Sequence, residues 1–159
     1  MTQRVNFDPA TMKDVWQAMA GLKTAIHKST LEHDLLKLLK VRVSQINGCG
    51  FCIDMHTKEA RAAGETEQRL YLLSAWREAL PTIYSNRERA ALAWAEAVTR
   101  LEHQDVADAV YDQVKREFSE QEIVALTLAV VEINGWNRFA ISFRRAAGSY
   151  ELGSLAKVS

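Results

Sequence analysis

The sequence has few of the residues that cross-link a chain or break its regular structure. Its 159 residues include two Pro, seven Gly and two Cys. Two cysteines cannot form the several disulfides that stabilise small secreted domains. A chain of this length can bury a hydrophobic core without such cross-links. We therefore expect a single domain over residues 1–159.

An excess of charge of one sign is also missing, as are long apolar runs. The 20 basic and 20 acidic residues give a formal net charge of zero, so no overall field attracts nucleic acid or acidic membranes. The first residues contain no apolar signal run, and no segment approaches the roughly 20 apolar residues of a membrane span. We expect a cytoplasmic protein with no nucleic-acid or membrane partner.

The sequence also lacks the sustained alternation of apolar and polar residues that is typical of strands. Apolar residues instead recur at helical spacing. The capping-box pattern, a Ser followed three residues later by Glu, occurs at residues 29–32, 85–88 and 119–122. These signals predict an all-α fold, a compact bundle of about seven helices. So many apolar helices favour burial of further surface by self-association.

One stretch, residues 47–56, contains both cysteines in the sequence Asn-Gly-Cys-Gly-Phe-Cys-Ile-Asp-Met-His. Good helix formers follow, so the motif is expected to begin a helix. Steps of three and four residues separate Cys49, Cys52, His56 and Glu59, which places them within a sector of about 80° on that helix. Both thiols and the imidazole should therefore face one space.

Two cysteines at this spacing can form a redox disulfide, supply half of a metal site, or be inert buried thiols. Haem c attachment requires a histidine directly after the second cysteine, where Ile53 stands. Structural zinc would need further ligands from His27, His33, His103 or a carboxylate. A thioredoxin fold would need strands beside the motif. In the cytosol, thiols are kept reduced, so a lone pair of cysteines there is more often catalytic than a structural disulfide. We therefore favour a dithiol redox site without a cofactor.

The position of the motif also suits thiol chemistry. A helix N-terminus and a neighbouring imidazole each favour the reactive thiolate. His56, one turn after Cys52, can accept its proton, while Cys49 is placed to attack an oxidised Cys52 and close the disulfide. This is the chemistry of a thiol peroxidase.

These residues carry a resemblance to a known family. Residues 47–61, 64–67 and 75–78 resemble the core of the AhpD-like alkylhydroperoxidases within the carboxymuconolactone decarboxylase family. Residues 88–97 and 134–138 resemble its small single-domain members. The resemblance implies an all-helical, AhpD-like antioxidant protein that forms trimers or hexamers.

The resemblance also implies roles for individual residues. Cys52 matches the cysteine that attacks the peroxide, Cys49 the resolving cysteine and His56 the relay histidine. The implied substrate is a hydroperoxide, and the implied reductant is a lipoyl group or a thioredoxin-like protein.

One position departs from the family pattern. The family relay begins with a glutamate twelve residues before the first cysteine, and this chain has Lys37 there. A lysine cannot act as that carboxylate, although its charge could lower the pKa of a nearby thiol. By its spacing, Glu59 is a candidate substitute, and the alternative is an ordinary exposed helix carboxylate. Asp34 is a weaker candidate.

Other functions remain open on the sequence alone. The site could serve a dithiol redox sensor or oxidoreductase that is not a peroxidase, or the chain could decarboxylate a lactone acid, the other named activity of the family.

Several polar residues outside the motif have two interpretations. Glu96 is either a site carboxylate or an exposed or ion-paired one. Asn134, Asn137 and Arg138 are expected to form helix-end and intersubunit hydrogen bonds or to contact substrate. The small, polar tail over residues 148–159 predicts partial disorder.

Overall fold

The computed structural model describes residues 2–7, 10 and 12–154. Within these ranges the chain forms seven α-helices, two short 3-10 helices and no strand, which confirms the predicted fold class. The α-helices are α1 (Lys13–His27), α2 (His33–Asn47), α3 (Gly50–Ala62), α4 (Glu67–Leu72), α5 (Asn86–Arg100), α6 (Asp108–Glu117) and α7 (Glu120–Ser142). The 3-10 helices are η1 (Leu73–Ala75) and η2 (Glu102–Gln104). None of the helices described is long and apolar enough to cross a membrane.

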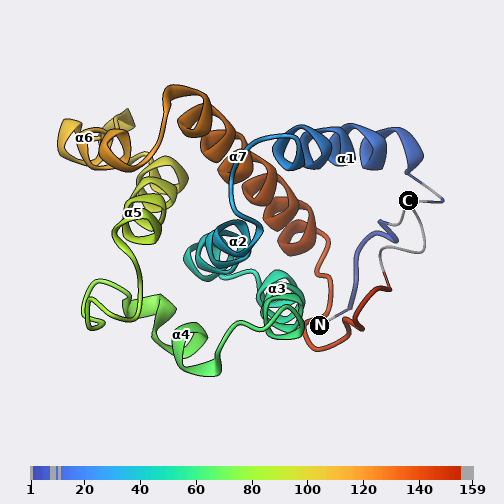
Figure 1. Cartoon of the computed structure of the whole chain (residues 1–159). Helices are drawn as coiled ribbons and strands as arrows, with labels where there is room; N and C mark the ends of the chain where they lie inside the picture. Colours follow the sequence, from blue (N-terminus) through green and yellow to red (C-terminus); the bar gives the residue numbers. More distant parts are fainter. Residues whose placement is uncertain (1, 8–9, 11, 155–159) are drawn as a thin grey trace.

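Helix α7, with 23 residues, runs through the middle of the bundle (Figure 1). Helices α1, α2 and α5 pack against it, while α3 packs mainly against α2 and α6 against α5. The side chains of Leu126, Ala129, Val130 and Ile133 on α7 are fully buried. The apolar run in this part of the sequence therefore forms the central core helix.

Two of the three predicted capping boxes are present and one prediction is wrong. The boxes at residues 85–88 and 119–122 begin α5 and α7, each with both reciprocal hydrogen bonds. Ser29 instead donates to the carbonyl of Ile26 at 2.6 Å, at the end of α1. Helix α2 begins only at His33, so Glu32 is its N-cap residue rather than its third residue, and the Glu32 carboxylate accepts hydrogen bonds from Arg87.

A tight turn joins α2 to α3 and fixes the position of the cysteines. Gly48 ends α2 with φ +68°, a left-handed conformation that glycine adopts without strain. Cys49 is then the N-cap of α3, and its sulfur accepts a hydrogen bond from the backbone N–H of Cys52 at 3.4 Å. The motif therefore begins a helix, as its spacing predicts.

The two ends of the described chain meet beside α3 and α7. Figure 1 shows the N-terminal and C-terminal segments running past each other on this side. The backbone N–H of Arg4 donates to the carbonyl of Phe143 at 3.0 Å, and Lys58 on α3 donates to the carbonyl of Tyr150 at 2.8 Å. These contacts place both segments over the face of the bundle that contains the cysteine motif.

Candidate active site

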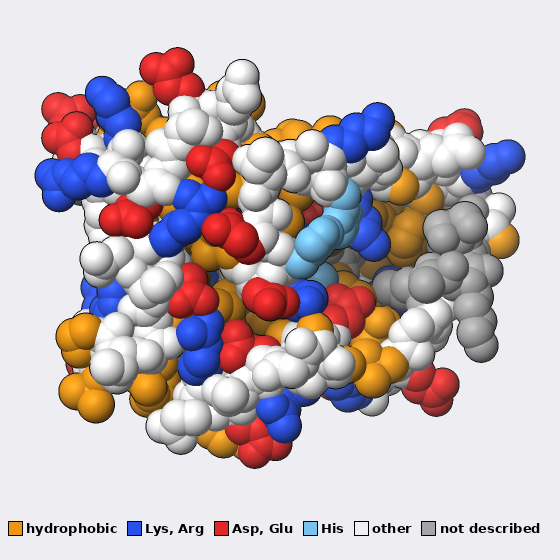
Figure 2. All heavy atoms as spheres, in the orientation of Figure 1, with side chains coloured by type: hydrophobic (Ala, Val, Ile, Leu, Met, Phe, Trp, Pro, Cys, Tyr) orange, Lys and Arg blue, Asp and Glu red, His pale blue; other side chains and the backbone are white. Residues whose placement is uncertain are grey.

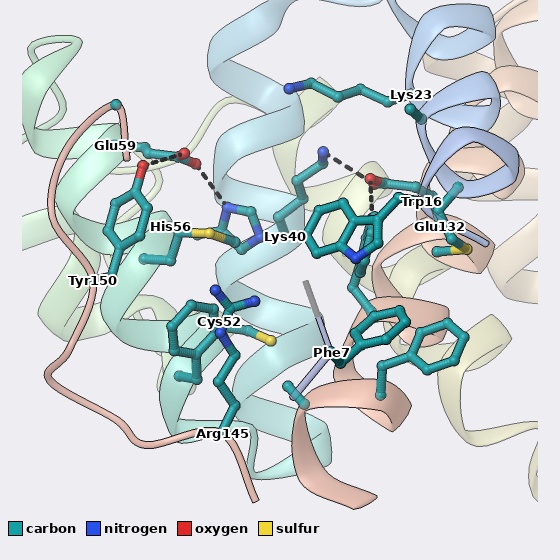
Figure 3. A pocket seen from close by; sticks show the side chains of 18 of the residues that line it. Phe7, Trp16, Lys23, Lys40, Cys52, His56, Glu59, Glu132, Arg145 and Tyr150 are labelled. Carbon is teal, nitrogen blue, oxygen red and sulfur yellow. Dashed lines mark hydrogen bonds and ion pairs between the residues drawn. The ribbon is translucent and has the colours of Figure 1, made fainter. Parts of the chain in front are cut away.

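A cavity of about 1000 Å³ lies among α1, α2, α3, α7 and the two chain ends. One wall is aromatic: the rings of Phe7 and Phe139 stack with centroids 4.7 Å apart, and those of Trp16 and Trp136 are also 4.7 Å apart. Figure 3 shows this wall facing the α2–α3 side of the pocket. A concave, mostly apolar site of this size suits an organic ligand.

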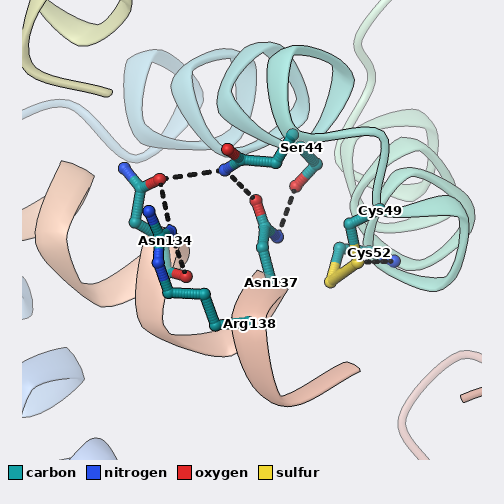
Figure 4. The surroundings of a disulfide bond; sticks show 7 residues. Ser44, Cys49, Cys52, Asn134, Asn137 and Arg138 are labelled. Carbon is teal, nitrogen blue, oxygen red and sulfur yellow. Dashed lines mark hydrogen bonds between the residues drawn. A yellow bond between two sulfur atoms is a disulfide. The ribbon is translucent and has the colours of Figure 1, made fainter. Parts of the chain in front are cut away.

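The two cysteines form a disulfide at one side of this pocket, with their Cα atoms 5.4 Å apart (Figure 4). Both residues are buried, with 1% of Cys49 and 2% of Cys52 exposed. They differ in position, because Cys52 lines the pocket and Cys49 lies behind it. A ligand in the pocket therefore meets Cys52 first.

His56 lies on the same helix and lines the same pocket. It is 7% exposed, and its Nδ1 is 3.0 Å from Oε2 of Glu59. In the tautomer that this contact favours, Nδ1 carries the proton and donates to the carboxylate, which leaves Nε2 as the acceptor. Figure 3 shows the imidazole between Glu59 and the pocket interior. Cys52, His56 and Glu59 all line this pocket, whereas Cys49, which the helical spacing also placed on this face, does not.

Glu59 is engaged on both oxygens rather than an isolated helix carboxylate. Oε2 contacts His56, and Oε1 accepts a hydrogen bond from the hydroxyl of Tyr150 at 3.0 Å. Burial alone would raise the pKa of Glu59, but the hydrogen bonds from His56 and Tyr150 outweigh it and lower the pKa below its usual value. Glu59 is therefore ionised at neutral pH.

Tyr150 was missed by the sequence analysis, and the prediction of disorder is wrong at this residue. Its side chain is 6% exposed, and its ring packs edge-on against Phe51 with centroids 6.4 Å apart. Its backbone N–H donates to Asp54 at 3.4 Å. Burial first, and then the hydrogen bond to Glu59, raise the pKa of the Tyr150 hydroxyl. No local pattern signals this role, because 91 residues separate Tyr150 from Glu59.

Further along the tail, Leu152 and Gly153 also line the pocket. Residues 148–154 follow a path of turns along α3, and residues 155–159 lie outside the described part of the chain.

Lys37, which replaces the family glutamate, forms an ion pair with Asp34 at 2.9 Å. The Asp34 side chain is 79% exposed, so it does not supply the missing acid. The cation that lies deeper in the pocket is Lys40, one turn further along α2, whose charge contributes to the lowered pKa of Glu59. Lys37 therefore occupies the position of the family glutamate, whereas Lys40 is the lysine whose charge acts on Glu59.

Lys40 pairs with a second carboxylate that sequence analysis did not single out. Its Nζ is 3.0 Å from Oε2 of Glu132 on α7, and Glu132 is 2% exposed. The other oxygen of Glu132 accepts a hydrogen bond from Nε1 of Trp136 at 2.9 Å. A charged residue within an otherwise apolar helix is the signal that could have identified it, because a buried carboxylate requires partners.

Amide side chains connect α2 to α7 beside the disulfide (Figure 4). The amide of Asn47 donates to the side-chain oxygens of Asn134, at 2.9 Å, and Asn137, at 2.8 Å. Asn137 donates in turn to the hydroxyl of Ser44 at 3.1 Å, and Arg138 donates to Asn134. These bonds lie within one chain and confirm the helix-end part of the prediction, and the intersubunit part stays a prediction. The network fixes the end of α2 from which the cysteine turn departs.

Glu96 is a structural carboxylate that does not line the pocket. It is 2% exposed and accepts hydrogen bonds from Arg42 at 2.7 Å, from Trp76 at 2.9 Å and from Arg77. Burial would raise its pKa, but the hydrogen bonds from Trp76, Arg77 and Arg42 lower it below the usual value. The ion-paired interpretation is therefore the correct one.

The described residues contain no group of three or more His, Cys, Asp or Glu side chains placed to bind a metal ion. Of the other histidines, His27 and His33 line the pocket, with ring centroids 5.0 Å apart. Histidine side chains are visible beside a hollow in the face shown in Figure 2. His103 lies in η2, away from the pocket.

Comparison with known proteins agrees with this architecture. The model of the carboxymuconolactone decarboxylase family matches residues 10–97, more than half of the 159-residue chain. The chain belongs to the carboxymuconolactone decarboxylase family. The family is named after an enzyme, carboxymuconolactone decarboxylase. This member is 41% identical to the uncharacterized protein YdfG of Bacillus subtilis (strain 168), over 94% of this chain and 99% of YdfG.

Solved structures place this family member among AhpD-like folds. The Agrobacterium tumefaciens protein ATU0492, named "Putative Antioxidant Defence Protein AhpD", superposes with a TM-score of 0.85 at 38% identity, covering 94% of this chain and 100% of ATU0492. The debrominase Bmp8 superposes with a TM-score of 0.77 at 19% identity, covering 94% of this chain and 80% of Bmp8. The second likeness shows the fold alone. Because this fold hosts different reactions, the reaction must be argued from the site.

Proposed function

We propose that this family member is a thiol-dependent hydroperoxide reductase. The observation that carries the proposal is the placement of the two sulfurs: Cys52 lines an apolar pocket together with His56, and Cys49 is bonded to it from behind. An organic peroxide in the pocket would meet one sulfur, while the second is already within reach of that sulfur. The likeness to ATU0492 supports the same class of reaction.

In the first step, the Cys52 thiolate attacks the terminal oxygen of the hydroperoxide. A bond forms between sulfur and oxygen, the O–O bond breaks, and its electron pair leaves on the alkoxide. Cys52 becomes a sulfenic acid and the hydroperoxide is reduced to an alcohol. The first turn of α3 stabilises the thiolate, because Cys52 lies three residues after the N-cap Cys49.

His56 moves the proton in this step. Its Nε2 takes the proton from the Cys52 thiol and returns it to the departing alkoxide. The Glu59 carboxylate, 3.0 Å from Nδ1, orients the ring and stabilises the imidazolium that forms in between. Glu59 thus serves as the relay acid in place of the family glutamate, whose position is occupied by Lys37 in this chain.

In the second step, the Cys49 thiolate attacks the sulfur of the Cys52 sulfenic acid. The S–O bond breaks, hydroxide leaves and takes up a proton as water, and the disulfide forms. This product is the state that the structure contains. An external dithiol, a lipoyl group or a thioredoxin-like protein, then reduces the disulfide and is itself oxidised. The reductant and a trimeric or hexameric assembly stay predictions.

A single-turnover experiment tests the proposal. One equivalent of tert-butyl hydroperoxide is added to the reduced protein, thiol loss is followed with time, and the product is identified by intact mass. We expect rapid loss of two hydrogens in the wild type. Cys52→Ser should abolish the reaction, whereas Cys49→Ser should stop at a sulfenic acid that dimedone traps.

The same experiment contains the refuting result. Oxidation no faster than that of a free thiol would remove the peroxidase proposal. A redox sensor, or a decarboxylase that does not need the cysteines, would then account better for the site.

A further inference from the structure

Positively charged side chains outnumber carboxylates around the pocket. Among the described residues that line it, five are basic and two are acidic. The basic residues are Lys13, Lys23, Lys37, Lys40 and Arg145, and the acidic residues are Glu59 and Glu132. The pocket therefore has an excess of positive charge, although the chain as a whole has a formal net charge of zero.

The carboxylates near the pocket already have partners. Glu59 is held by His56 and Tyr150, and Glu132 forms an ion pair with Lys40. Asp34 neutralises Lys37. Among the described residues, no carboxylate forms an ion pair with Arg145.

Arg145 is placed to serve a ligand. Its guanidinium lies over the ring of Phe51, with Cζ 3.9 Å from the ring centroid, and its backbone N–H donates to the carbonyl of Ala140 at 2.9 Å. Figure 3 shows the guanidinium reaching into the pocket, between His56 and Cys52 in that view. The side chain makes no hydrogen bond or ion pair within the described part of the chain, so its five N–H donors are available.

The environment of this cation is unfavourable without an anion. Burial lowers the pKa of Arg145, and no neighbouring charge opposes that effect. A guanidinium that has lost part of its water gains most from a bidentate contact with a planar, two-oxygen anion. A carboxylate has this geometry.

We propose that the pocket binds apolar organic acids, with the carboxylate held by Arg145 and the apolar body against the aromatic wall of Phe7, Trp16, Trp136 and Phe139. Resting on the proposed function, this makes hydroperoxides that carry a carboxylate the preferred substrates. The two ends of such a molecule match the two parts of the pocket, one cationic and one aromatic.

Calorimetric titration of the disulfide form tests this inference without any turnover. The probes are 4-phenylbutyrate and 4-phenylbutan-1-ol, which share an apolar body and differ in charge. The wild type should bind the acid more tightly than the alcohol. Arg145→Met, which keeps an apolar stem beside Phe51, should weaken binding of the acid about tenfold or more, the loss of one charged contact. Binding of the alcohol should be unchanged.

Two further variants sharpen the result. Arg144→Gln, a matched change of charge at the adjacent residue outside the pocket lining, should leave both affinities unchanged. Arg145→Lys, which keeps the charge without the planar fork, should give an intermediate affinity for the acid. Unchanged binding of the alcohol by Arg145→Met would show that the pocket is intact.

Equal affinity of the wild type for acid and alcohol would overturn the inference, as would unchanged acid binding in Arg145→Met. These outcomes are separate from the proposed reaction. If neutral tert-butyl hydroperoxide is reduced rapidly but the acid binds no more tightly than the alcohol, only the proposed anion site is refuted. If the acid binds selectively but no peroxide is reduced, only the peroxidase proposal fails.

Discussion

Replacement of Glu59 by Gln tests the acid of the proposed relay. Gln has nearly the shape of Glu, and its carbonyl can still accept the hydrogen bond from Nδ1 of His56, which is 3.0 Å from the carboxylate in the structure. The negative charge is lost. The variant therefore keeps the orientation of the ring and removes the stabilisation of the imidazolium, so it isolates the electrostatic part of the role of Glu59.

The size of the effect follows from the exposure of this carboxylate. A hydrogen bond to a charged group contributes about 1.5–3 kcal/mol. Because the Glu59 side chain is 40% exposed, solvent screens part of the interaction, so the lower part of this range, about 1.5–2 kcal/mol, applies. If that stabilisation is present only while the imidazolium exists, the rate constant for Cys52 oxidation should fall roughly 10- to 30-fold.

The assay is the single-turnover reaction with tert-butyl hydroperoxide, followed by stopped-flow tryptophan fluorescence and by intact mass. Glu151→Gln is the matched control, because Glu151 is exposed and does not line the pocket. It should oxidise at the wild-type rate. A Glu59→Gln protein that also oxidises at that rate, with the same folding stability, would refute the relay role assigned to Glu59.

Two other substitutions have defined outcomes. Tyr150→Phe keeps the ring packing but loses the hydrogen bond to Glu59, so denaturant titration should show a loss of about 1 kcal/mol, and peroxide oxidation should slow by less than in Glu59→Gln. Glu96→Gln leaves the buried Arg42 without its counter-ion and should cost about 3–5 kcal/mol in the free energy of unfolding. Because the folded-state pKa of Glu96 is lowered from 4.5, its stabilisation is present above pH 4.5 and is lost as pH falls through the lowered value. The wild type should therefore lose stability below pH 4.5 more steeply than Glu96→Gln, and a parallel loss in both proteins would contradict this assignment.

Local sequence patterns account for most of the fold and for the centre of the site. Helical spacing placed Cys52, His56 and Glu59 on one face, because that relation depends only on the geometry of a single helix. The capping boxes at residues 85–88 and 119–122 are likewise local, and both are present. Contacts between distant residues were not accessible in this way.

The failures have the same physical origin. The pattern at residues 29–32 satisfies the capping rule, but α2 begins only at His33, and the Glu32 carboxylate binds Arg87 of another helix. Tyr150 reaches Glu59 across 91 residues, a contact that no spacing rule contains. Lys37 stands at the position of the family's relay glutamate, but Lys40 is the cation that pairs with Glu132. Each of these depends on how helices pack, which the sequence does not state directly.

The walls of the pocket differ in how much they contribute to the hydrophobic core of the bundle. Cys52, His56 and Glu59 belong to α3, which packs on the buried α2, whereas the segments at residues 3–7 and 145–153 that also line the pocket come from opposite ends of the chain. The N-terminal segment is held to the end of α7 by the hydrogen bond from Arg4 to Phe143, and both end segments contribute little to the central core. Apart from Tyr150, whose hydroxyl donates to Glu59, the residues of these segments can therefore vary with little effect on the core of the bundle. Exchange of these two segments between relatives, with Tyr150 retained, should transfer substrate preference while the reaction stays the same.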